Sequence, residues 1–200
     1  MSKPILIAKR DGSKEELNLD KLHKVVFHAC EGISGVSPSE VEIKSQIQFY
    51  NGMTSKEIQE TLIKASADLI DDENPNYQFV AARLLLYGLY KQVFGSSWKV
   101  GFPDVHDHLV GGVSLRIYDE ELLGKYSMED WDKINSYVHH DRDLLFTYAG
   151  LRQVVDKYLV QDRSAGSVYE TPQYMYILIA ATLFANYPSE SRLYYVKKYY

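Results

Sequence analysis

The pattern of apolar and polar positions predicts a short hairpin and four helices in the first half of the chain. An apolar, β-branched run, PILIAK, is followed by the turn signal RDGS, and KEEL can return as a second strand. Beyond it, apolar residues recur every three to four positions, the spacing of helices that bury one face. We expect these helices over about 19–31, 39–50, 55–70 and 75–94.

Capping residues mark the starts of two of these helices. Asn18 or Asp20 can cap the first helix, because both side chains accept hydrogen bonds from free backbone N–H groups. Thr54 or Ser55 can cap the third, and Glu57 stands three residues after Thr54, as in a capping box.

Burial is predicted from the same periodicity. The second helix is expected to bury Val41, Ile43 and Ile47 and to be closed by Gly52, a typical helix C-terminal residue. The fourth contains VAARLLLYGLY, which is apolar nearly all round, so we expect it to be the central helix of its unit.

The second half of the chain is predicted to be another helical unit. A segment rich in Gly, Ser and Pro at 95–103 is the best candidate linker. A second hairpin is expected around RSAG, and a buried helix begins at Thr171 and Pro172. The other helices are expected over about 104–111, 119–126, 128–139 and 142–158. The last helical pattern has no C-terminal cap, so we expect a fragment of a longer protein.

Composition narrows the classes of function. The 200 residues are 46% hydrophobic, enough for a buried core, and 22 basic against 27 acidic residues leave a net charge of −5. This balance argues against a general nucleic-acid binder, so any phosphate site must be local. The longest apolar stretch, at 176–185, is too short to cross a membrane, and there is no export signal. We therefore expect no nucleic-acid partner, no membrane partner and a cytoplasmic location.

Several chemical groups have a simpler structural interpretation. Cys30, the single cysteine, lies on the apolar face of the first predicted helix and suits a core position. His106 and His108 could hold a metal, but DVHDH is better explained as a capped helix start. HHDRD at 139–143 joins two predicted helices, where capping explains its charges. The 17 tyrosines could serve radical transfer or base stacking, although packing is the plainer interpretation. We expect no catalytic residue and no metal site.

The stretch IAKRDGSKEELNLDKL combines features of an anion site. Lys9 and Arg10 stand beside the predicted turn, where both could meet phosphates. Lys21 lies in the first turn of the next helix, where its charge opposes the helix dipole unless an anion is bound. A solvated basic hairpin is the alternative.

Long segments of the chain resemble a known family in unchanged order. The chain is similar to the N-terminal part of the large (alpha) subunit of class I aerobic ribonucleotide reductase, in the bacterial and T-even-like phage branch. The resemblance covers essentially all 200 residues. Its main segments are KRDGSKEELNLDKLHKVV, IQFYNGMTSKEIQETLIKASADLI, NPNYQFVAARLLLYGLYKQVFG, HDRDLLFTYAGLRQVVDKYLVQDR and YETPQYMYILIAATLFANYP.

The resemblance implies a mainly α fold with a small β-hairpin cap. Residues 1–95 would form an ATP-cone, an allosteric nucleotide-binding domain of four helices under a hairpin. Residues 96–200 would form the helical start of the catalytic domain, and the ten-stranded α/β-barrel that follows in the family is absent from this chain.

The resemblance also implies the residues of the nucleotide site. Lys9, Arg10 and Lys91 would neutralise the triphosphate, while Glu15 and Asn18 would orient the base or sugar. The implied set is Lys9, Arg10, Glu15, Glu16, Leu17, Asn18, Leu19, Asp20, Lys21, Ser55 and Lys91. The family commonly has threonine where Ser55 stands and often histidine at the positions of Gln59 and Gly88. The preference for ATP or dATP, and the number of nucleotides, therefore stay open.

The implied function is allosteric control of ribonucleoside-diphosphate reductase. ATP, with Mg²⁺ on its phosphates, would leave the enzyme active, and dATP would inhibit it. The implied partners are the remainder of the large subunit, the radical-generating small subunit and other large subunits. With Cys30 as its single cysteine, the piece alone should be inactive. A free-standing nucleotide sensor or decoy is the alternative, and a transcriptional repressor is less compatible because it would need zinc-binding cysteines.

Overall fold

The computed structural model describes residues 5–9, 12–95 and 101–200. Two predicted features lie outside or partly outside these residues: the tip of the first turn, with Arg10 and Asp11, and residues 96–100 of the predicted linker. The chain divides into two compact units, one formed by residues 1–88 and 144–153 and the other by residues 89–143 and 154–200.

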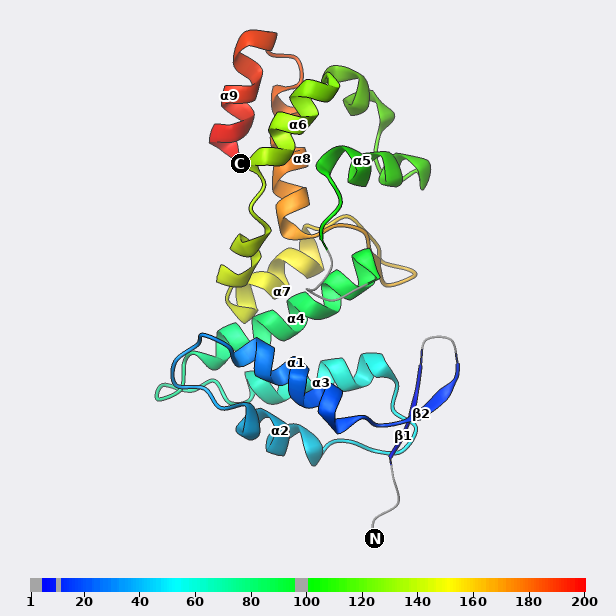
Figure 1. Cartoon of the computed structure of the whole chain (residues 1–200), viewed down its shortest axis with the longest axis vertical. Coiled ribbons are helices and arrows are strands. Elements are labelled where there is room, and N and C mark those ends of the chain that lie inside the picture. Colours follow the sequence, from blue (N-terminus) through cyan, green and yellow to red (C-terminus); the bar gives the residue numbers. More distant parts are fainter. Residues whose placement is uncertain (1–4, 10–11, 96–100) are drawn as a thin grey trace. The chain divides into compact units, whose positions relative to one another are not determined.

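The first unit begins with the predicted hairpin and continues into helices (Figure 1). Strands β1 (Leu6–Ala8) and β2 (Lys14–Glu16) pair antiparallel, with Ile7 opposite Glu15. The helices are α1 (Leu19–Cys30), α2 (Pro38–Gln46), α3 (Ser55–Ala67) and α4 (Tyr77–Phe94), of which the first unit holds α4 up to Gly88. This confirms a mainly helical unit with a hairpin.

Helix α4 supplies much of the core of the first unit, as its apolar sequence predicts. Val80 and Leu84 are fully buried, and Leu86 is 1% exposed. Arg83 Nη1 donates to the carbonyl oxygen of Glu31, just beyond α1, at 2.6 Å. This bond satisfies a backbone acceptor at the end of α1 and fixes that end beside α4.

Two predictions for α2 are wrong. Ile43 is 63% exposed and Ile47 is 84% exposed, whereas Val41 is buried. The reason is geometric, because two residues along a helix turn the side chain through about 200°, and Ile47 lies beyond the last helical residue. Gly52 does not close α2 either: its φ of +96° belongs to the turn that leads into α3.

The second unit has a separate apolar core. Trp131, Ile134, Leu109 and Ile177 are each at most 1% exposed and belong to one cluster. It includes residues 89–94 of α4 and shares η2 and α7 with the first unit. Its elements are α5 (Val105–Ser114), the 3₁₀ segments η1 (Glu120–Lys125) and η2 (His140–Leu145), α6 (Met128–Tyr137), α7 (Tyr148–Lys157), the hairpin β3 (Gln161–Asp162) and β4 (Ser167–Val168), α8 (Pro172–Phe184) and α9 (Ser189–Tyr199).

The predicted continuous helix over 142–158 is wrong. The 3₁₀ segment η2 ends at Leu145, and α7 begins three residues later at Tyr148. Thr147 Oγ1 accepts a hydrogen bond from the backbone N–H of Gly150 at 3.3 Å. A threonine that caps a new helix in this way competes with continuation of the preceding one.

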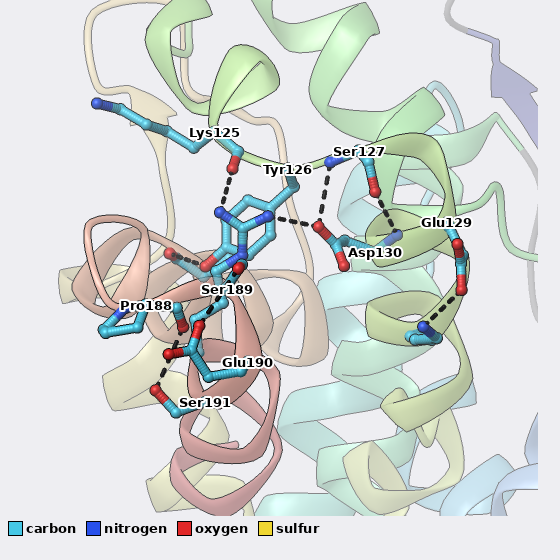
Figure 2. Close-up of polar contacts among 12 residues, drawn as sticks. Lys125, Tyr126, Ser127, Glu129, Asp130, Pro188, Ser189, Glu190 and Ser191 are labelled. Atoms are coloured by element: carbon cyan, nitrogen blue, oxygen red, sulfur yellow. Dashed lines mark hydrogen bonds and ion pairs between the residues drawn. The ribbon is translucent and has the colours of Figure 1, made fainter.

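A single arginine of α9, Arg192, contacts the start of α6 and the residues before it. Figure 2 shows Lys125, Tyr126, Ser127 and Asp130 of that region. Arg192 Nη2 lies 2.5 Å from Asp130 Oδ2, and Nη1 donates to the carbonyl oxygen of Lys125 at 2.7 Å. The guanidinium also lies over the ring of Tyr126, 4.6 Å from its centroid. Asp130 in addition forms a capping box with Ser127, so one carboxylate serves both the helix start and the contact with α9.

Within the described residues, the helices are too short or too polar to cross a membrane.

Candidate functional site

The hairpin of the first unit is hydrogen-bonded to the loop before α3. Ala8 N donates to the carbonyl oxygen of Met53 at 2.8 Å, and Gly52 N donates to that of Leu6 at 2.7 Å. Ala8 and Thr54 form a parallel bridge. These bonds place β1 beside the start of α3, where the predicted site residue Ser55 is half-buried.

Lys9 and Glu15 form an ion pair across the hairpin. Lys9 Nζ lies 2.6 Å from Glu15 Oε2, and the two side chains are 42% and 35% exposed. An ion pair this exposed contributes little to stability, so a more highly charged ligand could replace one partner at small cost. The structure therefore brings together one predicted phosphate ligand and one predicted ligand of the base or sugar.

The start of α1 contains the next four predicted residues. Asn18 is the N-cap, and its Oδ1 accepts from the backbone N–H of Lys21 at 2.9 Å. Leu19, Asp20 and Lys21 are exposed. The side chain of Asn18 thus stabilises the helix start, and Lys21 stands where the helix dipole favours an anion.

Helix α3 begins with the capping box predicted from the sequence. Glu57 Oε2 accepts from Thr54 N at 2.7 Å and from Thr54 Oγ1 at 2.8 Å, while Tyr50 OH donates to Glu57 Oε1 at 2.9 Å. The backbone N–H of Thr54, followed by its hydroxyl and that of Tyr50, lowers the pKa of Glu57. The capping bonds fix the helix start at which Ser55 is the first residue.

Gln59 of α3 packs against Gly88 of α4, and these are two of the three positions at which the sequence departs from the resembled family. Gln59 Nε2 donates to the carbonyl oxygen of Leu84 at 2.6 Å. A Cβ atom at Gly88 would lie 3.4 Å from Gln59 Cγ, so the Gln59 side chain packs closely over this glycine. The amide is therefore anchored beside α4 rather than free in solvent.

The remaining predicted residues are placed as follows. Glu16 is exposed in β2, and Leu17 N donates to the carbonyl oxygen of Ile5 at 2.8 Å. Lys91 is exposed on the last turn of α4, in the part of that helix that belongs to the second unit. Arg10 lies outside the described residues.

Sequence reasoning missed a buried polar network in the second unit. Asp143, within HHDRD, is 1% exposed and accepts from Tyr90 OH and from Gln173 Nε2, each at 2.8 Å. Burial raises the pKa of Asp143 to about 6. Its partners are 53 and 30 residues away in the sequence, so no local pattern could reveal them. The prediction that all the charges of HHDRD serve helix capping is therefore wrong for Asp143.

DVHDH also differs from its predicted role. Asp104 is the N-cap residue of α5 but makes no side-chain cap bond; its Oδ1 accepts from Asn135 Nδ2 at 2.6 Å. Asn135 Oδ1 in turn accepts from Val105 N at 3.0 Å, so a side chain of α6 caps α5. His108 stacks on Tyr174, and burial lowers its pKa to about 4. The part of the chain that the structure describes contains no cluster of three or more His, Cys, Asp or Glu able to hold a metal.

Two family models match the chain. Residues 5–92 match the ATP cone domain, and residues 144–200 match the ribonucleotide reductase all-alpha domain. The chain is a homologue of ribonucleotide reductase alpha subunits. Its ATP-cone is thus the part that contains the hairpin, the Lys9–Glu15 pair and the starts of α1 and α3.

Individual relatives extend this result over the whole chain. The "ribonucleoside-diphosphate reductase subunit alpha" of Haemophilus influenzae is 45% identical over 200 residues, and the "ribonucleoside-diphosphate reductase 1 subunit alpha" of Escherichia coli K12 is 47% identical over 200 residues. That of Enterobacteria phage T4 is 40% identical over 198 residues. The chain spans about a quarter of the length of these relatives, 26% of the first two and 25% of the third.

Proposed function

We propose that the chain is the regulatory N-terminal portion of a ribonucleoside-diphosphate reductase large subunit and that its ATP-cone binds ATP or dATP. The match of residues 5–92 to the ATP-cone supports this proposal. So does the juxtaposition of a basic hairpin with the starts of two helices, because free N–H groups and the helix dipole favour bound anions there. We retain residues 1–95 and 96–200 as the proposed domains.

The charge arrangement assigns a role to each part of the site. Lys9 would bind a phosphate oxygen in place of Glu15, and Glu15 would accept from the base or sugar. Lys21 and the exposed start of α1 would bind the same triphosphate. Arg10 and Lys91 complete the proposed set of cations, and Mg²⁺ would add charge neutralisation on the phosphates.

The proposed regulation depends on differential binding. ATP would stabilise an active assembly, whereas dATP would stabilise an inactive one, and such control requires each nucleotide to distinguish the two assemblies. The proposed partners are the remainder of the large subunit, the radical-generating small subunit and other large subunits. Reduction of ribonucleotides would be carried out by the whole enzyme.

Titration calorimetry with ATP and with dATP tests the site. Lys9→Ala should weaken binding by about 1–3 kcal/mol, the range for a lost charge-assisted hydrogen bond. Lys44→Ala is the matched control, because Lys44 is exposed on the last turn of α2, away from the hairpin pairings. Absence of nucleotide binding by the folded chain would refute the proposal, and unchanged affinity of the Lys9 variant would move the site elsewhere.

Activity measurements distinguish this role from a free-standing sensor. Mixing the chain with the missing remainder of a large subunit and a small subunit should restore reductase activity that responds to dATP. A sensor or decoy would instead change the nucleotide response of a complete reductase to which the chain is added.

A further inference from the structure

The second unit contains a cavity that the nucleotide proposal does not use. It has a volume of about 570 Å³ and is bordered by residues of α5, η1 and α8. Its walls are mainly apolar and include Leu109, Leu122, Met175, Leu178 and Leu183. A cavity of this size and lining can enclose much of a small organic molecule.

A buried carboxylate is among the lining residues of this cavity. Glu170 lines the cavity and is 2% exposed. Its Oε1 accepts from Val160 N at 2.8 Å, and its Oε2 accepts from Tyr118 OH at 2.7 Å. Among the described residues, no basic side chain forms an ion pair with this carboxylate or lowers its pKa. Burial raises the pKa of Glu170. Because each carboxylate oxygen can accept a second hydrogen bond, the group retains capacity for a cationic donor.

Tyr118, the hydroxyl donor to Glu170, is held in a fixed position. Tyr118 packs directly on Gly112, where a Cβ atom would lie 2.0 Å from Tyr118 Cδ2. The backbone reaches this position through Arg116, whose φ is +58°, and through a 2.8 Å bond from Ile117 N to the carbonyl oxygen of Gly112. His108 Nε2 lies 3.3 Å from Tyr118 OH on the other side. The hydroxyl that binds Glu170 is therefore positioned by the fold before any ligand arrives.

The charges around the cavity favour a cation. Lys125 Nζ is held by Glu121 Oε1 at 2.8 Å and by Asn186 Oδ1 at 3.1 Å. Figure 2 shows its side chain extending away from Tyr126 and Asp130. Asp119 and Glu170 are the other charged lining residues, so carboxylates outnumber cations three to one among the described residues that line the cavity.

We propose that this cavity binds a small organic cation, a primary amine on an apolar aromatic or alkyl body. The ammonium group donates to Glu170 and supplies the counter-ion that the buried carboxylate lacks in the described part of the chain. The apolar body lies along Met175 and Leu178, where it removes apolar surface from water. This inference is independent of nucleotide binding by the ATP-cone.

Phenethylamine and phenethyl alcohol are the matched probes, titrated into the 200-residue chain at neutral pH and followed in amide NMR spectra. The amine should shift the Val160 and Leu183 amides in a saturable way. The alcohol should bind about tenfold more weakly, since it lacks the charge that pairs with Glu170. Equal affinities for the two probes would show that the cavity recognises only the apolar body and would overturn the proposal. The absence of saturable shifts with the amine would also overturn it.

Two variants assign the binding to this cavity. Glu170→Gln keeps an acceptor for Val160 N and should weaken the amine by about tenfold while leaving the alcohol unchanged. Leu183→Trp should abolish binding of both probes by filling the cavity, and it should leave folding intact because Leu183 is 53% exposed. Glu129→Gln is the control, because Glu129 (labelled in Figure 2) is an exposed carboxylate, and its ion pair with Lys133 is 2.7 Å long. Unchanged amine binding in the folded Leu183→Trp variant would refute the site, even if Glu170→Gln did not fold.

Discussion

The two units place their charged and polar groups in opposite environments. In the first unit, Lys9, Glu15 and Asn18 lie at or near the surface, where Lys9 pairs with Glu15 across the hairpin and Asn18 caps a helix start. In the second, Asp143 and Glu170 are nearly fully buried and accept hydrogen bonds from distant parts of the unit. Surface groups can exchange a protein partner for a charged ligand at small cost, whereas buried groups specify packing and make stability depend on pH.

The largest expected effect tests whether the first unit depends on its apolar core rather than on its surface polar groups. Leu86→Ala should lower the free energy of unfolding by about 2–5 kcal/mol, because Leu86 is 1% exposed and its truncation leaves a cavity. Ile47→Ala is the control, since a side chain that is 84% exposed should change stability by no more than about 0.5 kcal/mol. Urea denaturation measures both, and equal effects would contradict the burial described for α4.

Acid should destabilise the second unit more than the first. Burial lowers the pKa values of His108 and His140 to about 4, so both are neutral in the folded unit and bind protons first in the unfolded chain. Their stabilising effect is present above about pH 6.5 and is lost as the pH falls towards about 4. Asp143, with its pKa raised to about 6, acts in the opposite direction. Its contribution to the free energy of unfolding falls as the pH rises from about 4 to about 6. Glu170, whose pKa burial also raises, opposes the histidines in the same direction as Asp143. Because the pKa values of both histidines fall from 6.5 to about 4, we expect their effect to prevail, with a net loss on the order of 1 kcal/mol on acidification.

Asp143→Asn sharpens this pH prediction. The variant removes one of the two carboxylates that oppose the histidines, so the dependence of the unfolding free energy on pH between about 4 and 6 should become steeper. His139→Gln serves as the control because the His139 side chain is exposed. Denaturation midpoints measured across this pH range provide the test, and a shallower dependence in Asp143→Asn would contradict the assigned direction.

A smaller effect tests the feature that the two units share. Thr54 and Ser127 both belong to capping boxes, with Glu57 and Asp130 respectively. Thr54→Ala and Ser127→Ala should each cost about 1 kcal/mol, the usual loss for a removed N-cap side chain. Thermal unfolding of both variants checks this, and a negligible change in either would mean that its cap bond contributes nothing in solution.

The smallest effect is expected at Thr171, the cap residue of α8. Its hydroxyl is buried and has no hydrogen-bond partner among the described residues. Thr171→Val should therefore leave stability unchanged or raise it by up to about 1 kcal/mol, because it removes an unsatisfied polar group without a change of shape. Thr54→Val is the matched comparison and should be destabilising. A clear loss at Thr171 would reveal a bond that this structure does not contain.

Local signals predicted much of the fold. The capping box at Thr54 and Glu57 and the apolar helix α4 are present as expected, and both hairpins form. Such features depend on residues within one or two turns of one another, so their physical causes are contained in short stretches of sequence. The break between η2 and α7 was missed, although Thr147 stands at it, because the apolar spacing continues across the break.

The residues of the candidate nucleotide site were predicted partly from local sequence signals and partly from the family resemblance. The anion-binding character of Lys9, Arg10 and Lys21 followed from their residue types and positions, while the fuller set came from a resemblance over the whole chain. The structure added the pairing of Lys9 with Glu15 and the anchoring of Gln59 on α4 at Gly88, which no spacing predicts. Both depend on side chains brought together by the packing of separate elements.

The sequence by itself determined the order of the elements, their capping signals and the apolar character of α4. Tertiary structure alone decided that Asp143 and Glu170 are buried, that Ile43 and Ile47 are exposed, and that a cavity lies beside α8. The physical reason is that hydrogen-bonded helices and caps are local, whereas burial and the environment of a charge depend on which distant segments pack against it.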